Sequence, residues 1–177
     1  MSQLISKHYL EQQQALHRNP DYGVASLGFA PMVADLVNSL EISDLLDYGC
    51  GKGRLVQSLA GKVQRNLTVR CYDPAIPEYA TPPAPAQMVV CIDVLEHIES
   101  ASLNAVLDDL ARCTRQYGLF SVHTGPAQKV LDDGRNAHLI QNPPEWWLSK
   151  LSRRFDLQTF QRTPNGFYVL VSARAAR

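Results

Sequence analysis

The sequence predicts an α/β domain with a mostly parallel, doubly wound sheet of about six strands. Short apolar runs alternate with segments of helical periodicity along the 177 residues, a pattern typical of parallel sheets with helices on both faces. Three glycines, Gly49, Gly51 and Gly53, directly follow the first apolar run. Two final strands separated by a short polar segment indicate a C-terminal hairpin, which adds an antiparallel strand.

The composition is typical of a globular domain and does not favour a dedicated nucleic-acid binder. Hydrophobic residues make up 45% of the chain, and 17 Lys and Arg balance 17 Asp and Glu. A substantial core is therefore possible, and no basic surface for nucleic acid is required, although a local patch would still permit one. The four cysteines form no Cys-x-x-Cys pair, so we expect reduced, mostly buried thiols.

No apolar run approaches the length of a membrane span, and the N-terminus has no apolar core of the signal-peptide type. We therefore expect a soluble, cytoplasmic protein without a membrane partner. The composition and pattern carry no information on the oligomeric state.

Residues 1–177 are expected to form one domain, in which residues 1–28 supply an N-terminal helix and lid segment and residues 29–177 the core. Apolar residues at roughly helical intervals predict a helix over residues 2–18 that acts as a lid or brace. After a turn over residues 19–23, Pro31 is expected to be the first residue of the next helix.

Residues 45–55 predict a strand, a glycine turn and a helix. Asp47 ends the apolar run, and apolar residues at helical spacing follow the three glycines. Glycine is needed where the backbone takes positive φ or lies against a ligand, and a helix that begins there presents unpaired N–H groups. A nucleotide-like cofactor is the first hypothesis.

The middle of the chain continues the alternation of strands and helices. Each of two strands ends in an acid, Asp73 and Asp93, and a segment with five prolines between them must be a loop. The expected elements are a strand over residues 67–72, a loop over 74–85, a strand over 88–92, a helix over 103–110 and a strand over 119–122.

The C-terminal third begins with a polar, turn-rich stretch over residues 123–141, where we expect a functional loop. Asn142 is expected to cap a helix that contains Trp146 and Trp147, one in the core and the other able to line a substrate pocket. The list of elements ends with strands over residues 155–160 and 167–171, joined through residues 161–166.

Four polar side chains fall at the carboxyl ends of predicted strands: Asp47, Asp73, Asp93 and His123. Ligands of such sheets bind outside these ends, so one crevice is expected to hold all four. Arg54 stands where the dinucleotide fingerprint needs its third glycine, so that fit is poor. An acid about 20 residues after Gly53, at the end of the next strand, suits the two hydroxyls of a ribose.

The strings LLDYGCGKGRL, YDP and VVCIDVLEHI resemble the first, second and fourth motifs of class I S-adenosylmethionine-dependent methyltransferases. The resemblance covers about residues 30–175 and implies a Rossmann-like fold with S-adenosylmethionine as cofactor. The cofactor site that it implies comprises Asp47, Gly49, Cys50, Gly51, Gly53, Asp73, Pro74, Asp93, Val94 and Leu95.

Within that site, the resemblance places Asp47 and the backbone around Gly49 and Gly51 near the amino-acid part of the cofactor, and Asp73 at the ribose. Such families usually have a helix and a short strand between the second and fourth motifs, ending in a turn that holds the adenine. Here only the proline-rich loop is present, so we expect the third strand to be missing and assign no residue to the adenine. Cys50 is interpreted as a packed residue.

Methyl transfer is an in-line displacement, and a base is needed only when the acceptor must lose a proton. The candidates for this base are Glu96, His97, His123 and His138. No metal is predicted. The alternative is a divalent ion held by Asp93, Glu96, His97 and His123, which resembles the Glu-x-x-Glu-His…His site of Hen-type RNA ribose methyltransferases, with Asp93 in place of the first glutamate.

The sequence therefore predicts methyl transfer from S-adenosylmethionine to an unidentified acceptor, with a small molecule favoured over nucleic acid. Two alternatives stay open. One is a metal-assisted RNA ribose methyltransferase, and the other is an S-adenosylmethionine-binding protein without turnover.

Overall fold

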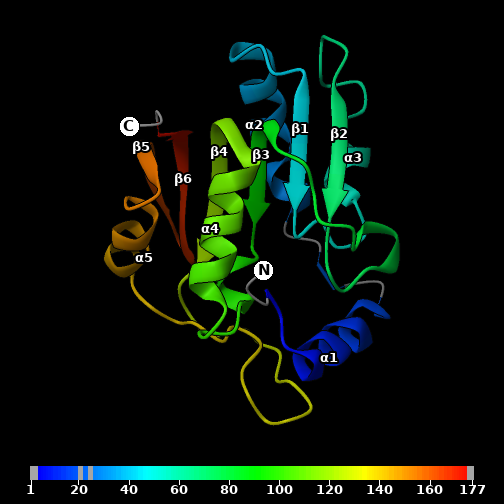
Figure 1. The fold of residues 1–177 in the computed structure, drawn as a ribbon, viewed down its shortest axis with the longest axis vertical. Coiled ribbons are helices and arrows are strands. Elements are labelled where there is room, and N and C mark those ends of the chain that lie inside the picture. The colour runs from blue at the N-terminus through cyan, green and yellow to red at the C-terminus, as the bar shows by residue number, and fades with distance from the viewer. Residues whose placement is uncertain (1–3, 20–21, 24–25, 175–177) are drawn as a thin grey trace.

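A computed structural model describes residues 4–19, 22–23 and 26–174 and contains one six-stranded sheet with the order β2-β1-β3-β4-β6-β5 (Figure 1). The strands are β1 (Asp44–Tyr48), β2 (Thr68–Tyr72), β3 (Ala86–Ile92), β4 (Thr114–His123), β5 (Phe155–Thr163) and β6 (Gly166–Ala173). The helices are α1 (Lys7–His17), α2 (Ser26–Ser39), α3 (Arg54–Leu59), α4 (Leu103–Cys113) and α5 (Pro144–Leu151).

The first four strands are parallel, and β6 pairs antiparallel with both β4 and β5. The carboxyl ends of β1 to β4 therefore share one edge of the sheet. The predicted mostly parallel, Rossmann-like sheet with an antiparallel C-terminal hairpin is confirmed. The expected loss of a third parallel strand is confirmed too, because β2 is the edge strand and the proline-rich loop beyond it forms only the short 3₁₀ helix η1 (Pro77–Tyr79).

Helices cover both faces of the sheet. Behind the sheet in Figure 1, α2 and α3 pack on β1 and β3, where Val33 and Leu45 are fully buried. In front, α4 and α5 cover a larger cluster that includes Trp147 and Phe120. Because β3 has core on both faces, it reads as a continuous apolar run, as is usual for central parallel strands.

Two predicted helix starts are wrong. The first helix begins at Lys7, because the Ser6 hydroxyl accepts a hydrogen bond from the Tyr9 amide and caps the helix there. Residues 2–3 of the expected helix lie outside the described residues. The helix α2 begins at Ser26, so Pro31 lies inside it. Proline removes one backbone donor, but the apolar face that starts at Ala30 is buried and continues through the helix.

Two details of the C-terminal third also differ from expectation. The N-cap of α5 is Pro143, with extended backbone and no side-chain bond, while the Asn142 carbonyl accepts a hydrogen bond from the Trp147 indole at 3.1 Å. The hairpin is longer than predicted, because β5 and β6 pair as far as Thr163 and Gly166 and leave only residues 164–165 for the turn. Cross-strand pairing thus continues through residues whose composition is typical of a turn.

None of the helices in the described ranges is both long enough and apolar enough to cross a membrane. The longest of them, α2, has 14 residues.

Trp147 and Trp146 provide a matched test of the core. Trp147 is fully buried, whereas Trp146 is half-buried beneath the Lys150 ammonium, which lies 4.4 Å from its ring centroid. Trp147→Ala should lower the free energy of unfolding by about 3–5 kcal/mol, because it leaves a large cavity. Trp146→Ala should cost clearly less. Urea unfolding of both variants checks this, and equal losses would contradict the packing.

Candidate active site

A cavity of about 920 Å³ opens at the carboxyl edge of the parallel strands. Its walls come from the segments that follow β1, β2, β3 and β4, and from α1, which lies across this edge beside the 123–141 loop (Figure 1). All four residues expected at one crevice line it: Asp47, Asp73, Asp93 and His123. Such a volume lies near the upper end of the range of about 300–1,000 Å³ for small-ligand sites.

The glycine turn forms the floor of the cavity. Gly49, Gly51 and Gly53 all have positive φ, and a β-carbon on Gly49 would lie 2.5 Å from a methyl carbon of Val94. The amides of Gly49 and Cys50 both donate to the Tyr72 carbonyl, at 2.7 and 3.1 Å, which ties the turn to the end of β2. Positive φ and close packing together explain why glycine is needed at 49.

Not every residue of the turn faces the cavity. Gly49, Cys50 and Gly51 line it, whereas Gly53 does not and instead forms the N-cap of α3. The Cys50 thiol is buried and hydrogen-bonded to Cys71, and this bond, together with burial, raises its pKa. A thiol held in its neutral form is a poor nucleophile, in agreement with the interpretation of Cys50 as a packed residue.

Asp73 connects the glycine turn to the next loop. One carboxylate oxygen accepts from the Gly51 amide at 2.9 Å, and the other accepts from the Ala75 amide at 2.9 Å. The adjoining Pro74 also lines the cavity. A carboxylate has about four acceptor positions, so Asp73 retains the capacity to accept two further hydrogen bonds from a ligand.

Asp47 is the least satisfied acid of the site. It is 2% exposed, and its Oδ2 has no hydrogen-bond partner among the described residues. Burial raises the pKa of this carboxyl to about 8, with smaller contributions from Cys71 and Asp73. A buried polar atom without a partner is costly. Its position on a cavity wall therefore indicates that a ligand donor belongs there.

The segment after β3 turns sharply. Asp93 has a φ of 58°, which is uncommon for a residue with a side chain, and its amide donates to the Ser121 hydroxyl at 3.0 Å. Asp93 and Val94 line the cavity. Leu95, the first residue of the 3₁₀ helix η2 (Leu95–His97), points instead into the core in front of the sheet and is fully buried.

Glu96 lies behind the cavity wall and does not line it. It is fully buried, and one of its oxygens accepts from the His123 amide at 2.5 Å, which fixes the end of β4. The other oxygen has no partner in the described part of the chain. Burial, and then the nearby Asp93, raise the pKa of Glu96. In this position Glu96 reaches an acceptor only through a neighbouring group.

Three histidines meet on a second part of the cavity wall. The rings of His97 and His123 lie 4.8 and 4.7 Å from that of His138, and all three line the cavity. The Nδ1 atoms of His97 and His138 lie 2.8 and 2.7 Å from the carbonyl oxygens of Ala137 and Gly125. Carbonyls only accept, so both rings donate from Nδ1, and in the neutral form of either ring the lone pair is on Nε2.

His97 is a neutral base at neutral pH. Burial lowers the pKa of His97 to about 4, although Asp93 opposes the shift. His123 is held differently, since its Nδ1 lies 3.2 Å from both the amide nitrogen and the carbonyl oxygen of Gly125. A neutral imidazole with a free Nε2 facing a cavity can accept a proton from a bound molecule.

One group of possible metal ligands stands out among the described residues. Asp93, Glu96 and His138 each offer one ligand atom, and these atoms lie within 4.8 Å of one another. The set expected from the sequence had His97 and His123 in place of His138. Neither of those rings belongs to this group.

The helix α1 contributes residues to the site that the sequence analysis did not single out. Tyr9, Gln13 and His17 stand four residues apart, on one face of α1, and all line the cavity. The Tyr9 hydroxyl donates to the His97 carbonyl at 2.7 Å, and the amide and hydroxyl of Ser6 donate to Glu99 at 2.8 and 2.7 Å. The four-residue spacing of Tyr9, Gln13 and His17 indicates one helical face, but the sequence does not indicate that this face lines the cavity.

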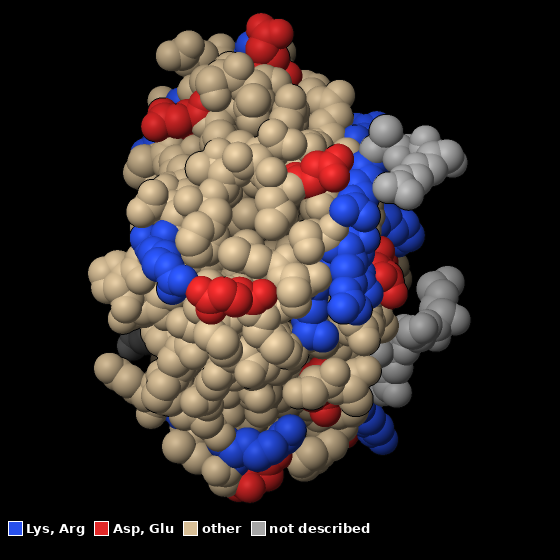
Figure 2. Space-filling view, turned by 90° about the vertical axis from the view of Figure 1, so that its left-hand side faces the viewer, with Lys and Arg blue, Asp and Glu red and all other residues tan. Residues whose placement is uncertain are grey.

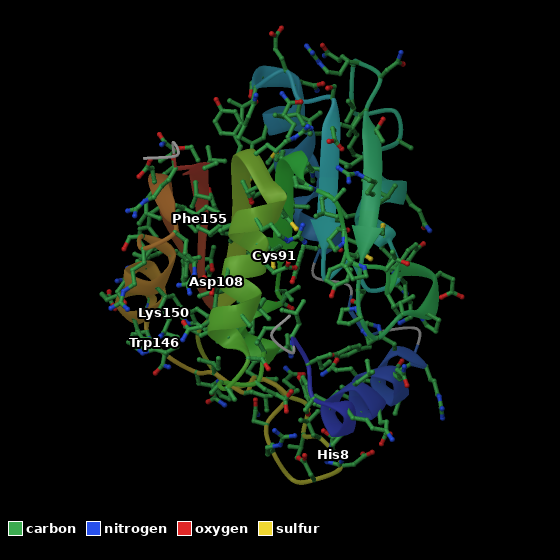
Figure 3. The ribbon with its side chains drawn as sticks, in the orientation of Figure 1. His8, Cys91, Asp108, Trp146, Lys150 and Phe155 are labelled. Carbon is green, nitrogen blue, oxygen red and sulfur yellow. The ribbon has the colours of Figure 1, made fainter. Side chains whose placement is uncertain are left out.

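By contrast, Trp146 does not line the cavity. It lies with Lys150 on α5, on the side of the molecule away from α1 and the labelled His8 (Figure 3). The expectation that one of the two tryptophans lines a substrate pocket is wrong, because α5 packs against the front of the sheet far from the carboxyl edge of β1 and β2.

Comparison with known proteins defines the class of protein to which this chain belongs. Residues 13–174 match a family model described as a methyltransferase domain, so the chain belongs to this family of methyltransferases. The predicted class I S-adenosylmethionine-dependent methyltransferase is thereby confirmed. No curated protein matches the sequence.

Solved structures show the same fold at low sequence identity. The 1,6-didemethyltoxoflavin-N1-methyltransferase of Burkholderia thailandensis, with bound 1,6-didemethyltoxoflavin and S-adenosylhomocysteine, is 18% identical with a TM-score of 0.62, covering 100% of this chain and 93% of its own. The magnesium protoporphyrin IX methyltransferase of Synechocystis is 14% identical with a TM-score of 0.60, covering 96% and 95%. The methyltransferase domain of bacterial CtHen1 is 15% identical with a TM-score of 0.58, covering 82% and 99%.

The raised pKa of Asp47 predicts how stability depends on pH. From about pH 4 to about pH 8, the folded chain holds a proton on this carboxyl that the unfolded chain has released, so the free energy of unfolding falls as the pH rises. Asp47→Asn removes this contribution. The variant should therefore gain stability relative to the wild type between about pH 5 and about pH 9.

Urea unfolding at several pH values measures this difference. The matched control is Asp35→Asn, a change at an exposed acid on α2. A difference between Asp47→Asn and the wild type that stays constant with pH would contradict the buried, protonated carboxyl.

Proposed function

We propose that this methyltransferase transfers the methyl group of S-adenosylmethionine to a small-molecule acceptor bound in the cavity beneath α1. The observation that carries the proposal is the composition of this single cavity. The glycine turn and two acids, Asp47 and Asp73, form one wall, and the three histidines, whose rings contact one another, form a second.

The cofactor fits the first wall. Asp47 has a buried oxygen without a partner in the described ranges, as needed to receive the α-ammonium group of the methionine part. Asp73 retains acceptor capacity for the two ribose hydroxyls. Gly49 and Gly51 leave the backbone open to close approach. When bound, S-adenosylmethionine supplies an electrophilic methyl group on its sulfonium.

The acceptor fits the second wall. His97 and His138 both line the cavity and donate from Nδ1 to carbonyls, so in its neutral form either ring can use Nε2 to take the proton that an O–H or N–H acceptor loses on methylation. His123 lines the same wall, while Glu96 acts there by holding the end of β4 through the His123 amide. The site also contributes to catalysis by position, because holding the methyl donor and the acceptor in line lowers the barrier to methyl transfer.

The surroundings of the cavity support a small acceptor. The helix α1 and the 123–141 loop are joined over it, for instance by Gln12 to Asp133 at 2.9 Å. Two of the structures with similar folds are named for small molecules, 1,6-didemethyltoxoflavin and magnesium protoporphyrin IX. A cover of this kind leaves room for a small molecule beside the cofactor and little for a polymer.

The distribution of charges on the molecular surface also favours a small molecule over nucleic acid as the acceptor. On the face that carries β5 and α5, the described residues are mostly neither basic nor acidic, and Lys and Arg gather along one side with acidic residues near them (Figure 2). Arg154 pairs with Asp108 at 2.6 Å and Arg162 with Glu145 at 2.5 Å. Paired charges of this kind attract a polyanion less than a broad basic track does.

The proposal is tested by calorimetric titration with S-adenosylhomocysteine, the demethylated cofactor. The wild type should bind it, and Asp73→Ala should weaken binding at least about tenfold, because charged hydrogen bonds to the ribose are lost. The exposed Asp35→Ala serves as the matched control and should leave binding unchanged. Absence of binding by the wild type, or undiminished binding by Asp73→Ala, would refute the proposed cofactor site.

A binding protein without turnover predicts the same titration but no methylated product with any acceptor. The second wall favours an enzyme over this alternative. Imidazoles that line the cavity and are held through Nδ1 by carbonyls of the 123–141 loop suit a reaction better than the binding of the cofactor alone.

A second candidate function is metal-assisted methylation, as in the RNA ribose alternative. It is favoured by the group of Asp93, Glu96 and His138, whose ligand atoms lie within 4.8 Å of one another. Glu96 has a buried oxygen without a partner among the described residues, and the His138 Nδ1–H donates to a backbone carbonyl, as histidine ligands usually do. These three residues would hold a hard divalent ion, which would supply a positive charge to orient acceptor oxygens.

Titration with Mn²⁺ separates the two candidates. The metal-assisted candidate predicts stoichiometric binding by the wild type that is lost in His138→Ala and kept in His8→Ala, a change at an exposed histidine of α1. It also predicts that a chelator abolishes methyl transfer and that Glu96→Ala destroys it. Activity that survives the chelator would exclude this candidate and leave the metal-free proposal.

Two further expectations, a single domain over residues 1–177 and a cytoplasmic location, stay predictions. The four free cysteines support a reducing compartment.

A further inference from the structure

The carboxyl-terminal end of α1 lies directly over the glycine turn. His17, the last residue of α1, lines the cavity, and a β-carbon on Gly51 would lie 3.3 Å from its Cε1 atom. Lys52 reinforces this contact, because its ammonium donates to the Asn19 and Tyr22 carbonyls at 2.6 and 3.1 Å. The end of α1 is thus anchored to the segment that Asp47 and Asp73 flank.

His17 is held in place but has an unused polar atom. Its ring packs edge-on against Tyr22, with 5.1 Å between the centroids. Its Nδ1 is buried and finds no hydrogen-bond partner among the residues that the structure describes. An ordinary core histidine has its ring nitrogens satisfied by protein groups. An unsatisfied nitrogen on a cavity wall indicates a partner that arrives with a ligand.

The charges around this end of the cavity suit an α-amino acid group. Asp47 offers a carboxyl with a free oxygen, which fits an ammonium. His17 and Lys52 are basic groups beside the turn, and the Asp73 carboxylate acts on His17. The Lys52 ammonium is already engaged by two carbonyls. The imidazole of His17 is thus the donor available for a carboxylate next to an ammonium on Asp47.

We propose that His17 is a cofactor-positioning residue, which donates a hydrogen bond from α1 to the α-carboxylate of S-adenosylmethionine. This inference rests on the proposed function and adds the carboxylate partner that the glycine turn lacks. Because Ser6 and Tyr9 bind α1 to Glu99 and the His97 carbonyl, the same helix then contacts both the cofactor and the acceptor wall.

The test compares two ligands that differ only at this end. S-adenosylhomocysteine carries the amino-acid group, whereas 5′-methylthioadenosine lacks it and keeps the adenosine and the sulfur. His17→Ala should weaken binding of S-adenosylhomocysteine about tenfold and leave binding of methylthioadenosine unchanged. His17→Gln, which keeps a side-chain donor, should recover part of the loss.

His8→Ala is the control, because His8 lies on the same helix but is exposed and pairs with Asp133 at 3.7 Å. It should bind both ligands as the wild type does. Unchanged binding of S-adenosylhomocysteine by His17→Ala would overturn the proposal, and so would an equal loss for both ligands. If His17→Ala does not fold, the ratio of the two affinities in His17→Gln decides.

Titration of the wild type with both ligands separates failure of the proposed role of His17 from failure of the proposed function. Binding of both ligands without a selective effect at His17 refutes the role of His17 alone. Binding of neither ligand by the wild type refutes the proposed cofactor site, and the role of His17 with it.

Discussion

The hydrogen bonds that join the glycine turn to the end of β2 are the constraint on which the site depends. The Tyr72 carbonyl receives two amides of the turn, and the Asp73 carboxylate receives the Gly51 amide. These bonds require the backbone at Gly49 and Gly51 to take positive φ, and Val94 then packs against the bare face of Gly49. Segments after β1, β2 and β3 are thereby locked into one wall.

The site also concentrates polar atoms that the fold leaves unsatisfied. Within the described ranges, the buried side-chain atoms without a partner are on Asp47, Glu96 and His17, and all three residues lie at the carboxyl edge of the sheet. Each such atom lowers stability. Natural proteins keep unsatisfied groups of this kind mainly at functional sites, where a ligand completes them. The unsatisfied atoms therefore belong to residues that line the cavity or lie directly behind its wall.

Much of the fold was predictable, because its strands and helices have clear periodicities. The uninterrupted apolar run of β3 and the spaced leucines of α4 indicated their elements correctly, and acids marked the ends of strands. Boundaries were less predictable. Ser6 starts α1 through a local cap, and Pro31 is accommodated inside α2, because burial of the flanking apolar residues outweighs one missing backbone bond.

The sequence by itself determined the sheet and the glycine turn, since both follow from hydrophobic spacing and from the conformations open to glycine. Only the tertiary structure decided which polar groups face one another. Ser6 and Glu99 are separated by 93 residues, and His138 joins Asp93 and Glu96 from a loop without regular periodicity. Glu96 directly precedes His97, which lines the cavity, yet Glu96 lies behind the wall. Such pairings depend on how distant segments pack, for which local pattern carries no signal.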